Sequence, residues 1–163
     1  MILRAPAHAL DPRMRRFWLV ENAVAVLVVA VGIGIAAAVT ALAGAETAAW
    51  IVGLAGGGAV LVLAVLAVVA ARLDYAHFRY EVTENGLYVA RGWLWRRWQI
   101  VPHARVQTVD TTSGPLLRLF GLVAVEVTTA SSRGGSSIPG LTPPVADELV
   151  AELARRAGLE EGT

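Results

Sequence analysis

Two long segments without a charged side chain limit what this chain can fold into more than any other feature. No Asp, Glu, Lys, Arg or His occurs from residue 22 to 45, nor from 47 to 71. Each segment is longer than the roughly 20 residues that an α-helix needs to cross a hydrocarbon core. With 56% hydrophobic residues, the chain is also too apolar for an ordinary soluble domain. We therefore predict a transmembrane helical hairpin over residues 17–73, with helices at about 17–43 and 48–73.

The distribution of arginine predicts the orientation of this hairpin. Four arginines precede the first helix and Arg72 follows the second, whereas the short connection between them carries Glu46 and no basic residue. Basic residues that flank transmembrane helices are retained in the cytoplasm. We expect a multi-pass protein of the cell (inner, cytoplasmic) membrane, with a cytoplasmic N-terminal segment at 1–16 and a cytoplasmic domain at 74–163.

Small residues recur in both membrane helices. Gly53 and Gly57 stand four residues apart, the spacing at which small side chains let helix backbones approach closely. Two interpretations are open. The glycines pack the two helices of the hairpin together, or they form a docking face for another membrane subunit or a second copy of the chain.

The region from residue 74 onward has the pattern of an α+β domain. Phe78, Tyr80 and Val82 alternate with polar residues, as in a strand with one buried face. Asn85-Gly86 predicts a hairpin with a type I′ turn, since both of its central residues need positive φ. Further strands are expected at about 87–91, 95–101, 105–111, 123–128 and 136–139.

A helix is expected to close this domain. Thr142 suits the N-cap, Pro143 the first helical position and Gly158 the end of the helix. Its apolar stripe includes Leu149 and Leu153 and should cover the open side of a bent sheet. Strands followed by one closing helix predict an α+β or small barrel-like arrangement.

Charge and residue types predict a protein without catalytic, metal or nucleotide chemistry. From Arg79 onward nine arginines balance nine acidic residues, so no basic footprint for nucleic acid is present. The chain has no cysteine, and its three histidines lack further ligands at metal-site spacing. It has no lysine and so no phosphate-binding loop of the G-x-x-x-x-G-K-[ST] type. We expect a non-enzymatic protein with no cofactor, no metal and no nucleic-acid partner.

The stretch "RGWLWRRWQIVP", residues 91–102, is the strongest candidate for a contact surface. It holds three of the five tryptophans. Tryptophan is enriched at membrane interfaces, and arginine pairs with anionic headgroups. In an extended strand alternate residues share a face. One face would carry Trp93, Trp95 and Arg97, and the other Leu94, Arg96 and Trp98. These residues are expected to contact lipid or a partner; the alternative is that some of the tryptophans are core and the arginines solvated.

Arg118 is a separate candidate, because it stands between two leucines in a short segment bounded by Gly114 and Gly121. Its guanidinium is expected to satisfy carbonyl groups left unpaired where a strand ends. A contact with a partner or with lipid is the alternative role.

The order of these features resembles a known family. A membrane hairpin is followed by "YEVTENGLYVARG", then by "IVPHARVQTVDTTSGPLLRLFGLVAVEVTTA", "IPGL" and a terminal helix. This is similar to the YdbS type of bacterial pleckstrin-homology-like (PH-like) membrane protein. The resemblance implies a bent antiparallel seven-stranded sheet, or partly open barrel, capped by the C-terminal helix. It also implies a protein partner. The first hairpin loop, Glu84-Asn85-Gly86, lacks basic residues, so inositol phosphate binding is not expected there.

We therefore predict a membrane-anchored PH-like protein that acts as a protein-interaction or assembly module at the cytoplasmic face of the membrane. Its partner is another protein or a second copy, bound through the Gly/Ala faces of the membrane helices or through the PH-like domain. The alternative is a direct sensor of anionic membrane lipid through the Trp/Arg-rich hairpin.

Overall fold

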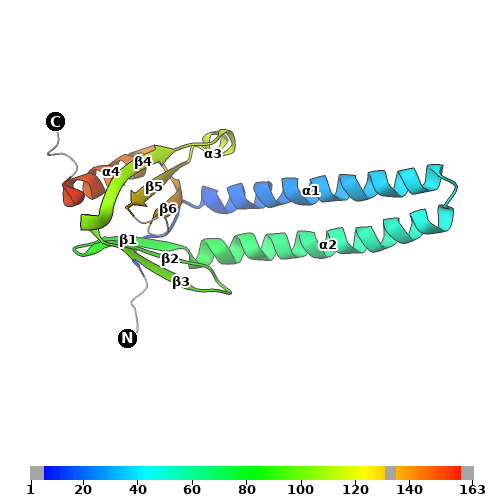
Figure 1. Cartoon of the computed structure of the whole chain (residues 1–163), viewed down its shortest axis with the longest axis horizontal. Helices are drawn as coiled ribbons and strands as arrows, with labels where there is room; N and C mark the ends of the chain where they lie inside the picture. Colours follow the sequence, from blue (N-terminus) through cyan, green and yellow to red (C-terminus); the bar gives the residue numbers. More distant parts are fainter. Residues whose placement is uncertain (1–5, 131–134, 159–163) are drawn as a thin grey trace. The chain divides into compact units, whose positions relative to one another are not determined.

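A computed structural model of the chain describes residues 6–130 and 135–158 (Figure 1). The chain forms two compact units. One, the helical unit, comprises Trp18–Arg72, and the other, the β-rich unit, comprises Met1–Phe17 together with Leu73–Thr163. The residues of each unit pack mainly against residues of the same unit.

The helical unit is an antiparallel pair of helices, α1 (Arg13–Leu42) and α2 (Glu46–His77), both long and apolar enough to cross a membrane. Between residues 22 and 70 the half-buried side chains of each helix stand three or four positions apart and form one seam along it. In α1 the seam consists of Asn22, Val26, Ala30, Ile33, Ala37 and Thr40, and in α2 of Ala49, Val52, Gly56, Val60, Ala64, Ala67 and Ala70. Most seam residues are small, which allows close helix packing.

The helix α2 continues four residues beyond the end predicted from hydropathy. Residues 74–77 are polar enough to leave the membrane yet compatible with a helix, and they belong to the β-rich unit. The Tyr75 hydroxyl donates a hydrogen bond to the Leu10 carbonyl oxygen at 3.3 Å. Residues 74–77 are therefore a helical turn that packs within the β-rich unit.

The β-rich unit contains two antiparallel three-stranded sheets. The first, sheet A, has the order β1 (Arg79–Thr83), β2 (Gly86–Arg91), β3 (Arg97–Val101). The second, sheet B, has the order β4 (Val106–Thr112), β5 (Val123–Thr129), β6 (Ser136–Leu141). A 3₁₀ turn, η1 (His103–Arg105), joins the sheets, and the short helix α3 (Pro115–Leu119) connects β4 to β5. The C-terminal helix α4 (Pro143–Ala157) packs on β4, β5 and η1 (Figure 1).

The core of this unit lies between the two sheets and α4. Its residues follow the alternation expected of strands: Val125 and Val127 are buried, whereas Glu126 and Thr128 between and after them are exposed. Other fully enclosed side chains are Leu87, Val89, Val101, Ile138 and Leu153. The predicted closing helix thus covers sheet B through Leu149 and Leu153 of the predicted stripe, whereas Val145 of that stripe is exposed.

The strand count implied by the family resemblance is not confirmed. Six strands form in the described ranges, at the six places where the residue pattern itself predicts them, rather than seven in one bent sheet or barrel. The strand β3 ends at Val101, because Pro102 follows it. Proline has no N–H to continue a ladder, and the chain then turns through η1.

The first hairpin forms where it was predicted, but its turn type was predicted wrongly. Gly86 pairs with Thr83, so the two-residue loop is Glu84-Asn85 and Gly86 is already in β2. Asn85 does not have positive φ, which a type I′ turn requires. Gly86, with φ +152°, is held against the neighbouring strand, where a Cβ would overlap the Val101 carbonyl group. Glycine is required at position 86 because the backbone of β3 approaches β2 closely there, and not because of the turn conformation.

The segment before α1 and the first turns of α1 are part of the core of the β-rich unit. His8 pairs with Tyr80 in an antiparallel bridge, and Leu10 and Met14 are buried. Phe17 packs edge-on against Phe120, with ring centroids 6.0 Å apart. No periodic pattern in residues 6–17 indicated such packing, because the contacts are made by single side chains, first in an irregular stretch and then in the first turns of α1.

Candidate functional site

The tip of the β2–β3 hairpin is a five-residue loop with exposed apolar side chains. Strand pairing ends at Arg91 and Arg97, which are directly opposite each other. Between them, Trp93, Leu94 and Trp95 are 40%, 65% and 84% exposed. We call these three residues the apolar tip. Gly92 opens the loop at φ +85°, and a Cβ there would overlap the Trp95 carbonyl oxygen.

This loop corrects the predicted start of the third strand. The strand begins at Arg97 rather than Trp95, so residues 93–96 do not alternate between two faces of a sheet. The strand prediction failed there because aromatic residues have high strand propensity, whereas their conformation is set by the turn at Gly92. Arg96 and Arg97 are both exposed beside the apolar tip.

Trp98 differs from the other two tryptophans of this stretch, because it is half-buried on the outer face of sheet A. Its ring stacks on Tyr88, with centroids 5.8 Å apart and planes 28° apart. Burial raises the pKa of the Tyr88 phenol, and its hydroxyl has no hydrogen-bond partner in the described part of the chain. Trp98 is therefore a packing residue of the sheet, and the apolar tip is the exposed part.

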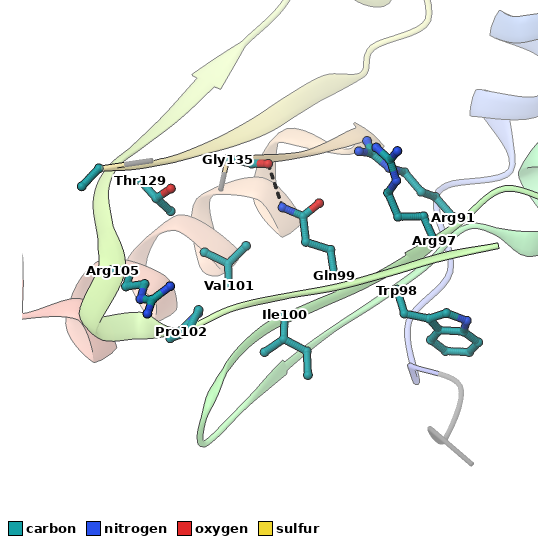
Figure 2. Close-up of a pocket in the computed structure, with 11 residues that line it drawn as sticks. Arg91, Arg97, Trp98, Gln99, Ile100, Val101, Pro102, Arg105, Thr129 and Gly135 are labelled. Carbon is teal, nitrogen blue, oxygen red and sulfur yellow. Dashed lines mark hydrogen bonds between the residues drawn. The ribbon is translucent and has the colours of Figure 1, made fainter. Parts of the chain in front are cut away.

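A large cavity follows the outer edge of β3. It has a volume of about 850 Å³ and is lined by every residue from Arg97 to Pro102 (Figure 2). Successive side chains of a strand point to opposite faces, so a cavity lined by all of them runs along the strand edge. Thr129 and Gly135, from the ends of β5 and the β5–β6 connection, form the far wall. We call this cavity the β3 groove.

A hydrogen bond fixes the width of the β3 groove. The Gln99 side-chain amide Nε2 donates to the Gly135 carbonyl oxygen at 2.9 Å (Figure 2). Gln99 shares a face of β3 with buried Val101, so this bond crosses the groove on its inner side. The strand edge itself lies outside the bond.

Three arginines line the β3 groove: Arg91, Arg97 and Arg105. The first two are a cross-strand pair, and their guanidinium groups lie together at one end of the groove, with Arg105 toward the other end (Figure 2). Like charges directly opposite each other destabilise a sheet. None of the three guanidinium groups has an ion-pair or hydrogen-bond partner among residues 6–130 and 135–158. The groove therefore carries uncompensated positive charge.

Sequence reasoning singled out Arg97 but missed Arg91 and Arg105. Arg91 would have been found from the register, because a five-residue loop ending at Arg97 places Arg91 opposite it. Arg105 could not have been found in this way, because it reaches the groove only through the turn at η1.

A second, smaller cavity of about 220 Å³ places the loop beside the end of α2 within the β-rich unit. Gly92 and Arg96 line it together with Ala76 and His77. The loop that carries the apolar tip thus lies next to the residues where the chain leaves the membrane helix.

Arg118 makes the type of contact that its structural interpretation expects. Its Nε donates a hydrogen bond at 3.0 Å to the carbonyl oxygen of Ser113, the residue directly after β4. Arg118 is not among the described residues that line the β3 groove.

The glycines of the hairpin have two distinct environments. At Gly56 an added Cβ would overlap the Ile33 side chain of α1, so this glycine forms the close helix contact. At Gly53 and Gly57 an added Cβ meets nothing within 4 Å. The Gly53/Gly57 face therefore points away from the helix seam and does not pack the hairpin together.

Metal-ligating residues do not cluster in the part of the chain that the structure describes: no group of three or more His, Asp or Glu side chains converges there. The buried His103 uses its Nε2 in a hydrogen-bonding contact with the Thr83 carbonyl oxygen, 2.9 Å away.

Comparison with known proteins places the chain in a family. No solved structure matches it. The chain is 35% identical over 108 residues to the UPF0699 transmembrane protein YdbS of Bacillus subtilis. The alignment covers 66% of this chain and 67% of that protein. The family model described as "Bacterial PH domain" matches residues 16–157, which include most of α1, all of α2, the six strands and α4. Neither description names an enzymatic activity. The chain is a transmembrane protein that belongs to the bacterial PH domain family.

Proposed function

We propose that this protein binds a partner protein through its PH-like domain and helps to assemble a complex at the cytoplasmic face of the membrane. The observation that supports this most is the β3 groove. It combines an open strand edge with three arginines that lack partners within the described ranges. Such a surface is suited to recognition, because both its backbone groups and its charges are available to another molecule.

The proposed orientation rests on the arginines that flank the helices and can be tested directly, because the chain has no cysteine. A single cysteine replacing Ala45, in the connection between α1 and α2, should react with a membrane-impermeant maleimide in intact cells. A cysteine replacing Thr111, exposed in β4, should react only after lysis. The reverse labelling pattern would contradict a cytoplasmic PH-like domain.

The assembly role is tested by purifying the full-length protein in mild detergent after cross-linking in native membranes. We expect one protein, either a different chain or a second copy of this one, to remain bound at a fixed ratio. A chain that is monomeric in both detergent and cross-linked membranes would contradict the proposal.

The Gly53/Gly57 face is the proposed contact for such a partner within the membrane. Replacing both glycines by leucine should weaken association about tenfold or more while the hairpin still inserts, because each leucine projects away from the helix seam. Gly56→Leu is the matched control: it should disturb the hairpin itself, because its side chain would collide with Ile33. Association can be measured by energy transfer between labelled copies in nanodiscs. Equal association of wild type and the double leucine variant would exclude this face.

Binding of anionic lipid is a second candidate function, supported by the apolar tip. Two tryptophans and a leucine exposed between arginines are typical of a loop that enters a membrane interface. A fluorophore on Leu94→Cys of the full-length protein should shift its emission to the blue in nanodiscs containing phosphatidylglycerol. Arg96→Glu should reduce the shift. The same fluorophore at Val145→Cys, in α4, should keep the emission it has in water, and a Leu94 probe that does so as well would exclude lipid contact by the tip.

A further inference from the structure

We propose that the β3 groove takes an extended acidic peptide segment of a partner protein, which adds to sheet A as a fourth strand beside β3. This inference rests on the proposed function and names the chemistry of the partner. Three features of the groove support it: the open edge, the length of β3 and the placement of the arginines.

The edge of β3 is available for strand addition. Sheet A has the order β1-β2-β3, and within residues 6–130 and 135–158 no strand pairs with the second edge of β3. An edge strand presents alternate N–H and C=O groups that seek partners, and peptides bind many domains by completing such a ladder. The opposite edge of the sheet differs, because His8 forms backbone hydrogen bonds of 3.0 Å with Tyr80 of β1 in both directions.

The groove matches a short strand in length. The five residues of β3 span about 17 Å at about 3.4 Å per residue. The cavity continues from Arg97 past Val101 to Pro102, so the whole strand edge borders open space. The Gln99–Gly135 hydrogen bond closes the inner side, which leaves the backbone edge as the surface that an incoming chain can reach.

Charge determines which peptide fits. Arg91 and Arg97 lie opposite each other at one end of the groove and repel each other, and Arg105 lies toward the other end. An incoming strand with carboxylates near both of its ends would neutralise these charges, and each Arg–carboxylate contact can be bidentate. A single phosphate group would reach one end of the groove and leave the strand edge unpaired. The arrangement therefore favours an acidic peptide.

The test uses full-length protein in nanodiscs of neutral lipid and a fluorescein-labelled peptide, Asp-Glu-Val-Thr-Val-Glu-Asp. Fluorescence anisotropy should show saturable binding. The double variant Arg91→Glu/Arg97→Glu should raise the Kd about tenfold or more, because two attractive contacts become repulsive. The matched control Arg96→Glu changes a neighbouring charge outside the groove and should alter the Kd less than about threefold. The milder double variant Arg91→Gln/Arg97→Gln should weaken binding to an intermediate degree. It serves as the test if the double glutamate variant fails to fold.

Three further peptides separate strand addition from simple charge attraction. A peptide with lysine in place of every acidic residue should not bind. Two peptides N-methylated on alternate amides keep the charges of the parent: in one the methylated amides face β3, and in the other they face away from it. The first cannot donate hydrogen bonds to β3 and should bind about tenfold or more weakly than the parent peptide. Equal binding of both N-methylated forms and the parent peptide would overturn the strand model. Saturation by inorganic phosphate, or by phosphatidylglycerol nanodiscs, with no peptide binding would assign the arginines to a phosphate-bearing ligand and also overturn it.

Failure of this inference and failure of the assembly role give different results. If a partner copurifies equally with wild type and Arg91→Glu/Arg97→Glu, assembly stands and the groove is not its site. If the acidic peptide binds as predicted but the chain is monomeric in cross-linked membranes, the groove stands and the assembly role fails.

Discussion

Replacing Gly86 by alanine should lower the free energy of unfolding of the β-rich unit by about 2–6 kcal/mol, the sum expected for backbone strain and overpacking. The added Cβ would overlap the Val101 carbonyl group and lie 2.9 Å from the Pro102 Cα. Both neighbours are backbone atoms at the end of β3, so they cannot move aside as a flexible side chain would. The φ of +152° adds strain for any residue with a Cβ.

Chemical unfolding of the full-length protein in detergent, followed by near-ultraviolet circular dichroism, measures this loss. Gly114→Ala is the matched control. Gly114 has φ −70°, and an added Cβ there meets nothing within 4 Å, so its substitution should change the free energy of unfolding by less than about 1 kcal/mol. Equal stability of Gly86→Ala and Gly114→Ala would show that the backbones of β2 and β3 separate easily at this point.

Replacing Met14 by alanine should cost about 2–5 kcal/mol, the usual range for a buried methionine. Met14 is 2% exposed. Its side chain fills the space beside Gly140, where a Cβ would lie only 2.6 Å from the Met14 Cγ and sulfur atoms. The truncation therefore opens a cavity between the N-terminal segment and β6, and the same unfolding experiment measures it.

Leu119→Ala is the control for this second substitution. Leu119 lies in α3 and is 79% exposed, so its truncation should alter the free energy of unfolding by less than about 0.5 kcal/mol. If Met14→Ala is equally mild, the N-terminal segment contributes little to the stability of the β-rich unit, despite its burial.

The elements of the β-rich unit could be predicted from sequence wherever local pattern and final burial agree. Alternation in β5 separates buried Val125 and Val127 from exposed Glu126 and Thr128, and proline and glycine mark the ends of α4. Predictions failed where a distant contact decides the local conformation. Asn85-Gly86 looks like a turn dipeptide, yet Gly86 is required by the approach of Val101 from another strand.

The candidate site was predicted only in part for the same reason. A cluster of Trp and Arg can be seen in the sequence, but which tryptophans are exposed depends on where pairing between β2 and β3 stops. The β3 groove is formed by strand ends from both sheets, so residues such as Arg105 and Thr129 become neighbours only through tertiary structure. Composition and periodicity contain no information on that proximity.

The burial of Leu10 and Met14 means that the β-rich unit is discontinuous in sequence, with the helical hairpin inserted into it. During synthesis, residues 6–17 can pack only after both membrane helices and the strands that follow them have been made. A truncated protein that starts at Leu73 would lack three core side chains, Leu10, Met14 and Phe17, and expose the apolar surface that they cover. Soluble versions of this domain should therefore join the N-terminal segment to Leu73 through a short linker, in place of the hairpin.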